Sequence, residues 1–382
     1  MRRPILLDIT RSLQRQARGA ATGIDRVEAA YSAALEAHYL YQSARLWAVL
    51  DADGLSRLRA ETPQLDLKAH LTPWRDRSRR QIEAALRRHA VWYGAGSDGL
   101  TLPAGTAWHY INVGHTSPLA DDLSRMRARG VAQITVMIHD VIPILYPHWC
   151  DAGAAARFAA RLRAVAAHAD RMLYVSQPAR GEVEAIMSAW GDVLDGHVIP
   201  PGIDVPPITR VPERGRFLML GTVEPRKNLS LLLDIWPDLA AEGAVLDVVG
   251  HAGWGSAPLV SRCRATPGVT YHGALPDAEV HALLARADAL LFPSLAEGAG
   301  LPVGEALGIG LPVIAHDLPC LKDLFGEAPH YVSAQNPAEW ADALRSRFRE
   351  HSATKPAYEA SKLEMPLPTW QTHFNVLERL LE

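Results

Sequence analysis

The sequence predicts an α/β protein built from two doubly wound, Rossmann-like domains that face each other across a cleft. Short β-rich runs alternate with amphipathic helical patterns along the whole chain, which is typical of βαβ units and parallel sheets. A proline-rich stretch over 199–207 divides the chain near its middle. The length of 382 residues suits two compact domains.

The first half of the chain is expected to form one sheet. Pro4–Ile9 predicts its first strand. A helix is expected to start after Thr22, because this residue can cap it together with Asp25 three positions later. Four more apolar runs predict further strands, at Arg45–Leu50, Trp108–Val113, Ile134–Ile138 and Arg171–Val175.

The second half repeats this organisation beyond the linker. Five apolar runs, each followed by a turn or helix signal, predict strands at Phe217–Leu220, Val245–Val249, Val269–Tyr271, Ala289–Phe292 and Val313–Ala315. Trp370–Leu381 has the apolar spacing of an amphipathic helix. We therefore expect a first domain over residues 1–202, a second over 203–365 and a C-terminal helix within 366–382.

Composition narrows the class of protein. With 39 Lys+Arg, 42 Asp+Glu and 48% hydrophobic residues, the chain is not of a disordered, collagen-like or coiled-coil class. Its 3 cysteines stand far apart without a C-x-x-C, which fits a reducing compartment better than a disulfide scaffold or zinc ribbon. The first apolar stretch breaks at Asp8, too early for a signal peptide, and Ile134–Tyr146 is shorter than the roughly 20 residues of a membrane-spanning helix. A cytoplasmic protein is expected.

The charge is unevenly distributed along the chain. Residues 1–205 hold 24 Lys+Arg and 21 Asp+Glu, whereas 206–382 hold 15 and 21. Arginines cluster within 75–88 and 125–129. Such a basic first domain suits peripheral contact with the anionic inner face of a membrane or with a phosphate-bearing substrate, and it is also typical of solvated helix faces. Nucleic acid is not an expected partner, because neither the net charge nor interleaved aromatic residues favour it.

Candidate chemistry lies directly after predicted strands, where ligands bind in doubly wound sheets. After Ala289–Phe292, Gly298 and Gly300 free the backbone so that amides at a helix start can point at an anion such as a diphosphate. Glu297 and Glu305 flank this anion site. Because carboxylates repel phosphate, we expect them to accept hydrogen bonds from sugar hydroxyls or to stabilise developing positive charge.

A second candidate segment, Gly221–Leu229, follows the strand predicted at Phe217–Leu220. Its adjacent cations, Arg226 and Lys227, form a place to neutralise a diphosphate leaving group. No metal ion is required for that neutralisation. The alternative is a pair of solvated cations.

Two further residues have a functional and a structural interpretation. His139 stands just past the buried strand predicted at Ile134–Ile138, where a histidine is either a satisfied core residue or a catalytic group. Gly23 opens the first predicted helix, whose amides either face donor phosphates or simply follow a helix cap.

Residues 294–306 read S-x-x-E-G-x-G-L-P-x-x-E-A and resemble the donor-site signature of family 4 glycosyltransferases, which are retaining sugar-nucleotide enzymes of the GT-B fold. The resemblance implies that Glu305 binds the nucleotide ribose and that Glu297 lies beside the donor sugar. The implied donor-binding residues of the loop are Gly298, Ala299, Gly300 and Leu301. The family commonly has phenylalanine at the position of Ala299, a departure that enlarges or softens the loop and bears on sugar selectivity more than on activity.

Other segments carry the same resemblance. Glu224-Pro225-Arg226-Lys227-Asn228 is similar to the family's diphosphate motif, with Lys227 matching the family lysine. Thr222, which this match places among the donor-binding residues, stands where the family usually has arginine, so we expect Arg226 to supply that charge. The H-D-x-x-P-x-x-x-P stretch from His139 resembles one in bacterial members, some of them mannosyltransferases, where the histidine faces the donor sugar. Further matches place Gly23 in an N-terminal glycine loop and Gly273, Ala274 and Leu275 around the nucleotide base, and imply a terminal helix that crosses back onto the first domain.

The resemblance implies a retaining hexosyltransferase of bacterial surface polysaccharide synthesis. GDP-mannose is the first choice of donor, with UDP-hexose and dTDP-rhamnose left open, and the acceptor is a glycan or lipid-linked glycan. Two alternatives come from other classes: a GT-B-fold isomerase acting on a nucleotide sugar, and a catalytically idle nucleotide-binding homologue, which the departures at Thr222 and Ala299 suggest. Asp51-Ala52-Asp53-Gly54 is either a metal-binding D-x-D or an ordinary turn.

Overall fold

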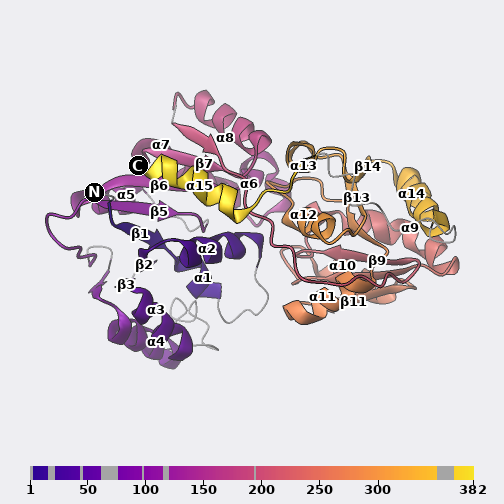
Figure 1. Ribbon diagram of the computed structural model, residues 1–382, viewed down its shortest axis with the longest axis horizontal. Helices are drawn as coiled ribbons and strands as arrows, with labels where there is room; N and C mark the ends of the chain where they lie inside the picture. The colour runs from indigo at the N-terminus through magenta and orange to yellow at the C-terminus, as the bar shows by residue number, and fades with distance from the viewer. Residues whose placement is uncertain are drawn as a thin grey trace.

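The structure is a computed structural model that describes residues 3–15, 22–43, 46–61, 76–96, 99–114, 120–192, 195–350 and 365–382. The described elements form two β-sheets, each with helices packed on it. The two sheets lie side by side along the long axis of the molecule (Figure 1). Both chain termini lie in the part that contains the first sheet (Figure 1).

The first sheet has eight strands in the order β4-β3-β2-β1-β5-β6-β7-β8. Pairing is parallel except at β2–β3 and β3–β4, which are antiparallel. The strands are β1 Ile5–Asp8, β2 Ala37–Gln42, β3 Leu46–Leu50, β4 Trp92–Ala95, β5 Trp108–Asn112, β6 Val131–Ile138, β7 Arg171–Tyr174 and β8 Gly196–Val198. The helices are α1 Thr10–Arg15, α2 Gly23–Ala34, α3 Ala52–Glu61, α4 Asp76–His89, α5 Ala120–Ala128, α6 Ile142–Leu145, the 3-10 turn η4 Pro147–Trp149, α7 Ala154–His168 and α8 Gln177–Ala189.

The second sheet has six strands, all parallel, in the order β11-β10-β9-β12-β13-β14. The strands are β9 Arg216–Leu220, β10 Val245–Val249, β11 Val269–Gly273, β12 Ala289–Phe292, β13 Val313–His316 and β14 His330–Val332. The helices are the 3-10 turn η5 Pro225–Lys227, α9 Leu229–Ala241, α10 Ala257–Ala265, α11 Asp277–Arg286, α12 Leu301–Gly308, α13 Pro319–Phe325 and α14 Pro337–Glu350.

The predicted strands are confirmed, and the structure adds four more. Arg45, predicted to begin a strand, lies outside the described residues, and β3 begins at Leu46. The added strands are β2, β4, β8 and β14. β2 reads A-H-Y-L-Y-Q, so polar side chains interrupt its apolar pattern, and β8 and β14 have only three residues each. Such strands are defined by their neighbours in the sheet more than by their own sequence.

Each sheet is covered on both faces, which gives each a pair of hydrophobic cores. Side chains alternate along a strand, so Leu6 and Leu7 of β1 enter different cores, and Phe217 and Leu218 of β9 do the same in the second sheet. The order of strands reverses at β1/β5 in the first sheet and at β9/β12 in the second. Loops that follow these strands form the crevice where ligands bind in such sheets.

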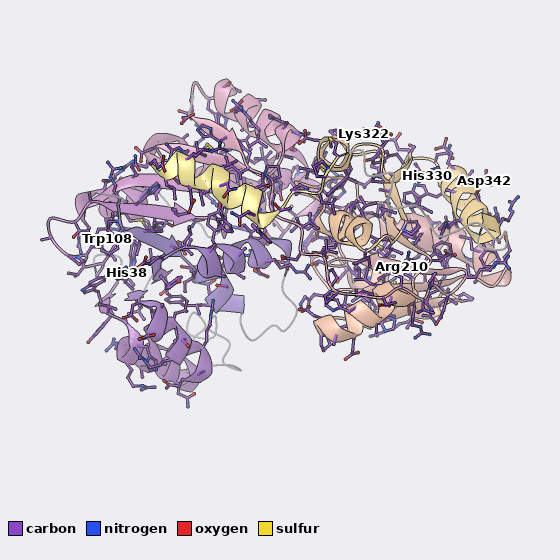
Figure 2. All side chains as sticks on the ribbon, viewed as in Figure 1. His38, Trp108, Arg210, Lys322, His330 and Asp342 are labelled. Carbon is purple, nitrogen blue, oxygen red and sulfur yellow. The ribbon has the colours of Figure 1, made fainter. Side chains whose placement is uncertain are left out.

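The linker joins the two sheets through specific contacts. Arg210, labelled in Figure 2, donates to the backbone carbonyls of Gly310 at 2.6 Å and Ala287 at 2.7 Å, which anchors the linker on the second sheet. A Cβ atom on Gly202 would lie 2.3 Å from the backbone nitrogen of Trp370, so only glycine fits where the linker passes the start of α15.

The terminal helix α15, Trp370–Leu381, lies along the part of the molecule that contains the first sheet (Figure 1). Leu377 enters the same core as Leu7. The His373 Nδ1–H donates to the carbonyl of Pro200 at 2.9 Å, and its Nε2 accepts from the Tyr31 hydroxyl at 2.8 Å. Burial lowers the pKa of His373 to about 4, so the imidazole is neutral at pH 7 and suits this pair of bonds.

Candidate active site

The loop after β12 meets the loops after β6 and β7 at the carboxyl ends of both sheets. The hydroxyl of Ser176 donates to the carbonyl of Gly298 at 2.8 Å. A Cβ atom on Gly298 would lie 2.0 Å from the carbonyl oxygen of His139. The loops after β12 and β6 are therefore in backbone contact, and no side chain fits between Gly298 and His139.

Four charged residues cluster on the second-sheet side of this contact. Glu297 Oε2 pairs with Arg226 Nη1 at 2.9 Å, and Glu297 Oε1 accepts from Lys227 Nζ. Arg226 Nε also pairs with Glu224 at 2.6 Å. The sequence predicted the cations and Glu297 as site residues, and the structure brings them together.

The backbone after β9 explains why these cations point at Glu297. Pro225–Lys227 form the turn η5, and Asn228 adopts the left-handed conformation (φ 53°, ψ 33°) before α9 begins. The amide of Leu295 donates to the carbonyl of Arg226 at 2.8 Å, which ties η5 to the loop after β12. The Lys227 ammonium also lies 5.1 Å from the ring centroid of Phe292, within cation–π range.

The charges of the cluster depend on one another. Burial alone would raise the pKa of Glu297, but Arg226 and Lys227 outweigh it and lower that pKa to about 2. Burial lowers the pKa of Lys227, and the carboxylate of Glu297 opposes this effect. An ionised Glu297 therefore holds both cations in place within a largely dry environment.

His139 is buried on the first-sheet side of the contact. Its Nε2 lies 2.7 Å from the carbonyl of Val113, which can only accept, so Nε2 carries a proton. Burial lowers the pKa of His139 to about 4, so the ring is neutral at pH 7. A neutral imidazole in this place can take part in hydrogen bonds but supplies no positive charge.

Asp140 is a site residue that was not predicted from the sequence. Burial raises its pKa, while Arg226 of the second sheet lowers it and Glu297 raises it further. Asp140 therefore faces the charged cluster from the opposite side. Its position directly after the buried strand β6 is the signal that could have identified it.

Glu305, on α12, pairs with Arg26 of α2. A Cβ atom on Gly23 would lie 3.1 Å from Leu301 Cδ1, so the starts of α2 and α12 also approach each other here. Burial raises the pKa of Glu305, and Arg26 opposes that rise. No motif predicted Arg26 as a site residue, although it stands three residues after Gly23 in the same helix start.

Substituting Arg26 is expected to loosen the approach of the two sheets. The side chain of Arg26 is 36% exposed, so the pair contributes at most about 1 kcal/mol, equivalent to a roughly fivefold shift in a closing equilibrium. Small-angle X-ray scattering without ligand should give a larger radius of gyration for Arg26→Met than for the unmodified protein. Arg11→Met is the matched control, because Arg11 pairs with Asp25 at 2.8 Å within the first α/β body. Equal radii for Arg26→Met and the unmodified protein would contradict this role.

The remaining predicted residues lie around Glu305 and beside the cations. Gly273 has a φ of 70° and its carbonyl accepts from the amide of Gly250 at 2.8 Å. Ala274 is exposed and Leu275 is partly buried against the second core. Asp277, which begins α11 after this loop, contributes to raising the pKa of Glu305, after burial as the main cause. Thr222 packs against the loop at Gly253. A Cβ atom added to Gly253 would lie 2.6 Å from the methyl group of Thr222.

Other candidate features have a structural account. Asp51 Oδ1 accepts from the amide of Gly54 at 2.7 Å, so the D-x-D pattern caps α3.

Across the described ranges, no group of three or more His, Cys, Asp or Glu side chains could hold a metal ion. Within the same part of the chain, no helix has both the length and the apolar character needed to cross a membrane. The predicted arginine cluster at 75–88 is described only from residue 76 on.

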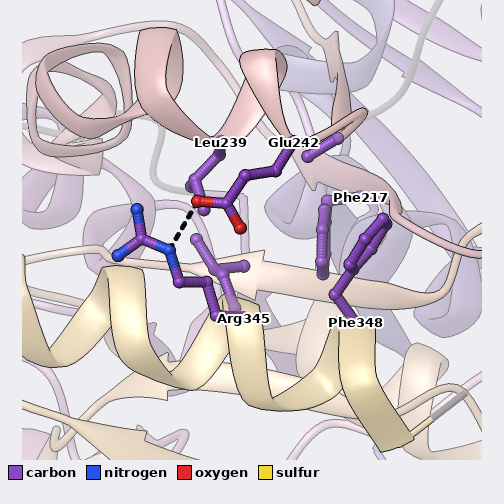
Figure 3. Close-up of a pocket in the computed structure, with 7 residues that line it drawn as sticks. Phe217, Leu239, Glu242, Arg345 and Phe348 are labelled. Atoms are coloured by element: carbon purple, nitrogen blue, oxygen red, sulfur yellow. Dashed lines mark hydrogen bonds and ion pairs between the residues drawn. The ribbon is translucent and has the colours of Figure 1, made fainter.

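A small pocket lies away from this site. It is enclosed between α9 and α14, where Phe217 and Phe348 lie near each other and Arg345 pairs with Glu242 at 2.7 Å (Figure 3). None of the candidate site residues lines it.

Two doubly wound sheets whose carboxyl-end loops meet at a shared site define the GT-B fold. The Anabaena protein HepE, solved in complex with UDP and glucose, has this architecture over 99% of both chains, with a TM-score of 0.63 at 15% identity. Residues 214–349 match the family model described as Glycosyl transferases group 1.

Several curated relatives are bacterial mannosyltransferases. The chain is 32% identical over 245 residues to the serotype-specific mannosyltransferase WbdA of Escherichia coli, a match that covers 57% of this chain and 30% of WbdA. It is 35% identical over 170 residues to the O-antigen chain mannosyltransferase B of Escherichia coli, covering 42% of this chain and 45% of the relative. The chain thus spans less than half of the length of these relatives, from 30% to 45%.

Proposed function

We propose that this protein transfers a hexose, with mannose as the first choice, from a nucleotide-sugar donor to a hydroxyl of a glycan or lipid-linked glycan in bacterial surface polysaccharide synthesis. The pairing of Arg226 and Lys227 with Glu297, where the two sheets meet, is the observation that carries the proposal. The names of the matched mannosyltransferases support mannose and an O-antigen-type acceptor. UDP-hexose and dTDP-rhamnose are the alternative donors.

The chemistry assigned to the cluster follows from its charges. Negative charge develops on the diphosphate as the bond to the sugar breaks, and Arg226, Lys227 and the amides at the start of α12 would stabilise it. Because two fixed cations supply this charge, the proposal requires no metal. Glu297, held between them, would accept hydrogen bonds from the donor sugar and stabilise its developing positive charge.

The other residues are assigned to binding and positioning. Glu305 would accept hydrogen bonds from the ribose hydroxyls, in exchange for its present partner Arg26. The loop at Gly273, Ala274 and Leu275 would line the base. Neutral His139 would contact the donor sugar from the first-sheet side, with transfer proceeding by front-face attack and retention of configuration.

A thermal-shift panel tests donor binding. GDP, UDP, dTDP and their sugar conjugates are compared with and without EDTA. A ligand at 100 times its Kd adds roughly 2.7 kcal/mol, and each kcal/mol moves the melting temperature by about 2–4 °C at this size. We expect GDP and GDP-mannose to raise the melting temperature by about 5–10 °C on these scales, unchanged by EDTA.

Product analysis completes the test. With the stabilising donor and an oligomannoside acceptor, NMR of the product should show that the anomeric configuration of the donor sugar is kept. If UDP or dTDP raises the melting temperature and GDP does not, the donor is a UDP-hexose or dTDP-rhamnose and not GDP-mannose. No shift with any nucleotide would contradict the donor site proposed here. A shift without transfer would favour the idle homologue, and a shift with donor isomerisation in place of transfer would favour the isomerase.

A further inference from the structure

Leu145, Tyr146, His148 and Trp149 form a surface cluster, here called the aromatic step, which follows the loop after β6. Tyr146 and Trp149 stack with ring centroids 4.6 Å apart and planes at 25°, and His148 lies 4.8 Å from Trp149. Leu145 beside them is 39% exposed. Leu145, Tyr146 and Trp149 do not belong to the hydrophobic cores of the described residues, so core packing does not explain the step. Leu145 is exposed and Tyr146 and Trp149 are half-buried, and apolar groups gathered at a surface in this way mark interaction sites.

The backbone holds this step in one conformation. Pro143 and Pro147 restrict α6 and η4. The amide of Tyr146 donates to the carbonyl of Ile142 at 2.8 Å, and the amide of Trp149 donates to the carbonyl of Tyr146 at 3.1 Å. A surface ordered before binding loses less conformational entropy when a ligand arrives.

The step adjoins the charged cluster. The amide of Ile142 donates to Asp140 Oδ1 at 3.2 Å, so α6 starts at a site residue. At the other end, burial raises the pKa of Cys150, Glu224 and Asp140 raise it further, and Arg226 lowers it. Both ends of the step therefore lie near the cluster, and α6 lies on the side of the first sheet that faces the second (Figure 1).

We propose that Tyr146 and Trp149 form a subsite for a pyranose ring of the acceptor glycan. A pyranose has an apolar C–H face that suits an aromatic ring and a rim of hydroxyls that suits carboxylates. Asp140 and Glu224 supply such carboxylates beside the step. This inference rests on the proposed transfer to a glycan and extends it by naming where the acceptor binds.

Substitution of Trp149 tests the subsite. With donor saturating, Trp149→Ala should raise the KM for α-linked mannotriose about tenfold, because the stacking surface is lost, while donor Kd and donor-only hydrolysis stay unchanged. Trp149→Phe keeps an aromatic ring and should recover most of the lost affinity. Tyr93→Ala is the matched control, because Tyr93 is 52% exposed on the edge strand β4. An unchanged mannotriose KM in Trp149→Ala would overturn the subsite and leave the proposed transfer standing.

Direct binding separates the subsite from the reaction. With GDP bound, saturation-transfer NMR should detect mannotriose on the unmodified protein and lose it with Trp149→Ala. If the unmodified protein does not bind mannotriose, the subsite is wrong even where nucleotide binding supports the donor site. A lipid surface is the alternative ligand of the aromatic step. Co-sedimentation with vesicles of phosphatidylglycerol and phosphatidylethanolamine tests for it. Loss of vesicle binding in Trp149→Ala with unchanged mannotriose binding would assign the step to lipid and overturn the proposal.

Discussion

Glu297→Gln is expected to lower kcat for transfer by at least 10²–10³-fold, the usual effect of removing one group that stabilises transition-state charge. The substitution keeps the shape of the side chain but removes the charge that holds Arg226 and Lys227. Both the stabilisation of the sugar and the placement of the two cations are then lost. Initial rates of transfer with saturating donor measure the effect.

The same substitution should also destabilise the protein. The side chains of Lys227 and Glu297 are 7% and 11% exposed, and breaking a buried pair costs about 3–5 kcal/mol. Arg226 retains Glu224, so Lys227 is the cation left alone. Adding Lys227→Met should therefore restore much of the melting temperature while transfer stays abolished, because the diphosphate has lost a cation.

Glu213→Gln is the matched control for this experiment. Glu213 also pairs with two cations, Arg216 and Arg286, but it is exposed and lies outside the site. Its substitution should change neither transfer nor stability appreciably. Full transfer activity in a folded Glu297→Gln protein would refute the assignment of the cluster as the donor site.

Gly298→Ala is expected to reduce transfer by roughly 10²-fold, since a displacement of about 1 Å at a reacting centre has an effect of this size. The added Cβ would lie 2.0 Å from the carbonyl oxygen of His139 and 3.3 Å from Val175 Cγ2. A backbone atom cannot avoid the clash by changing rotamer. The loop after β12 must move, or the two sheets must separate, and either change displaces Glu297 from His139.

A graded series of glycine substitutions checks this reasoning. On Gly181, in α8, a Cβ would meet nothing within 4 Å, so Gly181→Ala should leave transfer unchanged. On Gly23, a Cβ would lie 3.1 Å from Leu301 Cδ1, the end of a flexible side chain, so the loss should be small. Equal activities for the Gly181, Gly23 and Gly298 variants would show that transfer does not need the close contact seen here.

Sequence patterns were sufficient where a structural signal is local. Long apolar runs predicted the central strands because burial on both faces of a parallel sheet requires them. The strands β2, β4, β8 and β14, of which all but β2 lie at sheet edges, escaped prediction, because a short or half-polar strand depends on hydrogen bonds to a neighbour. The glycine-rich loop and the Arg226-Lys227 pair were recognisable because their chemistry lies within a few consecutive residues.

Contacts between residues of the two sheets could not be predicted from the sequence. Arg26 and Glu305 are 279 residues apart, and nothing near either residue specifies the other. Asp140 and Ser176 likewise become site residues only because the second sheet lies opposite them.

The sequence by itself thus determined the two doubly wound sheets, the linker between them and the loops that carry the cations and glutamates, because periodicity and local motifs encode these features. Tertiary structure alone decided which charges meet, because pairing at the contact depends on the relative placement of the two sheets. It set the low pKa of Glu297 and the neutral state of His139, since both follow from burial and neighbours that only the folded chain provides.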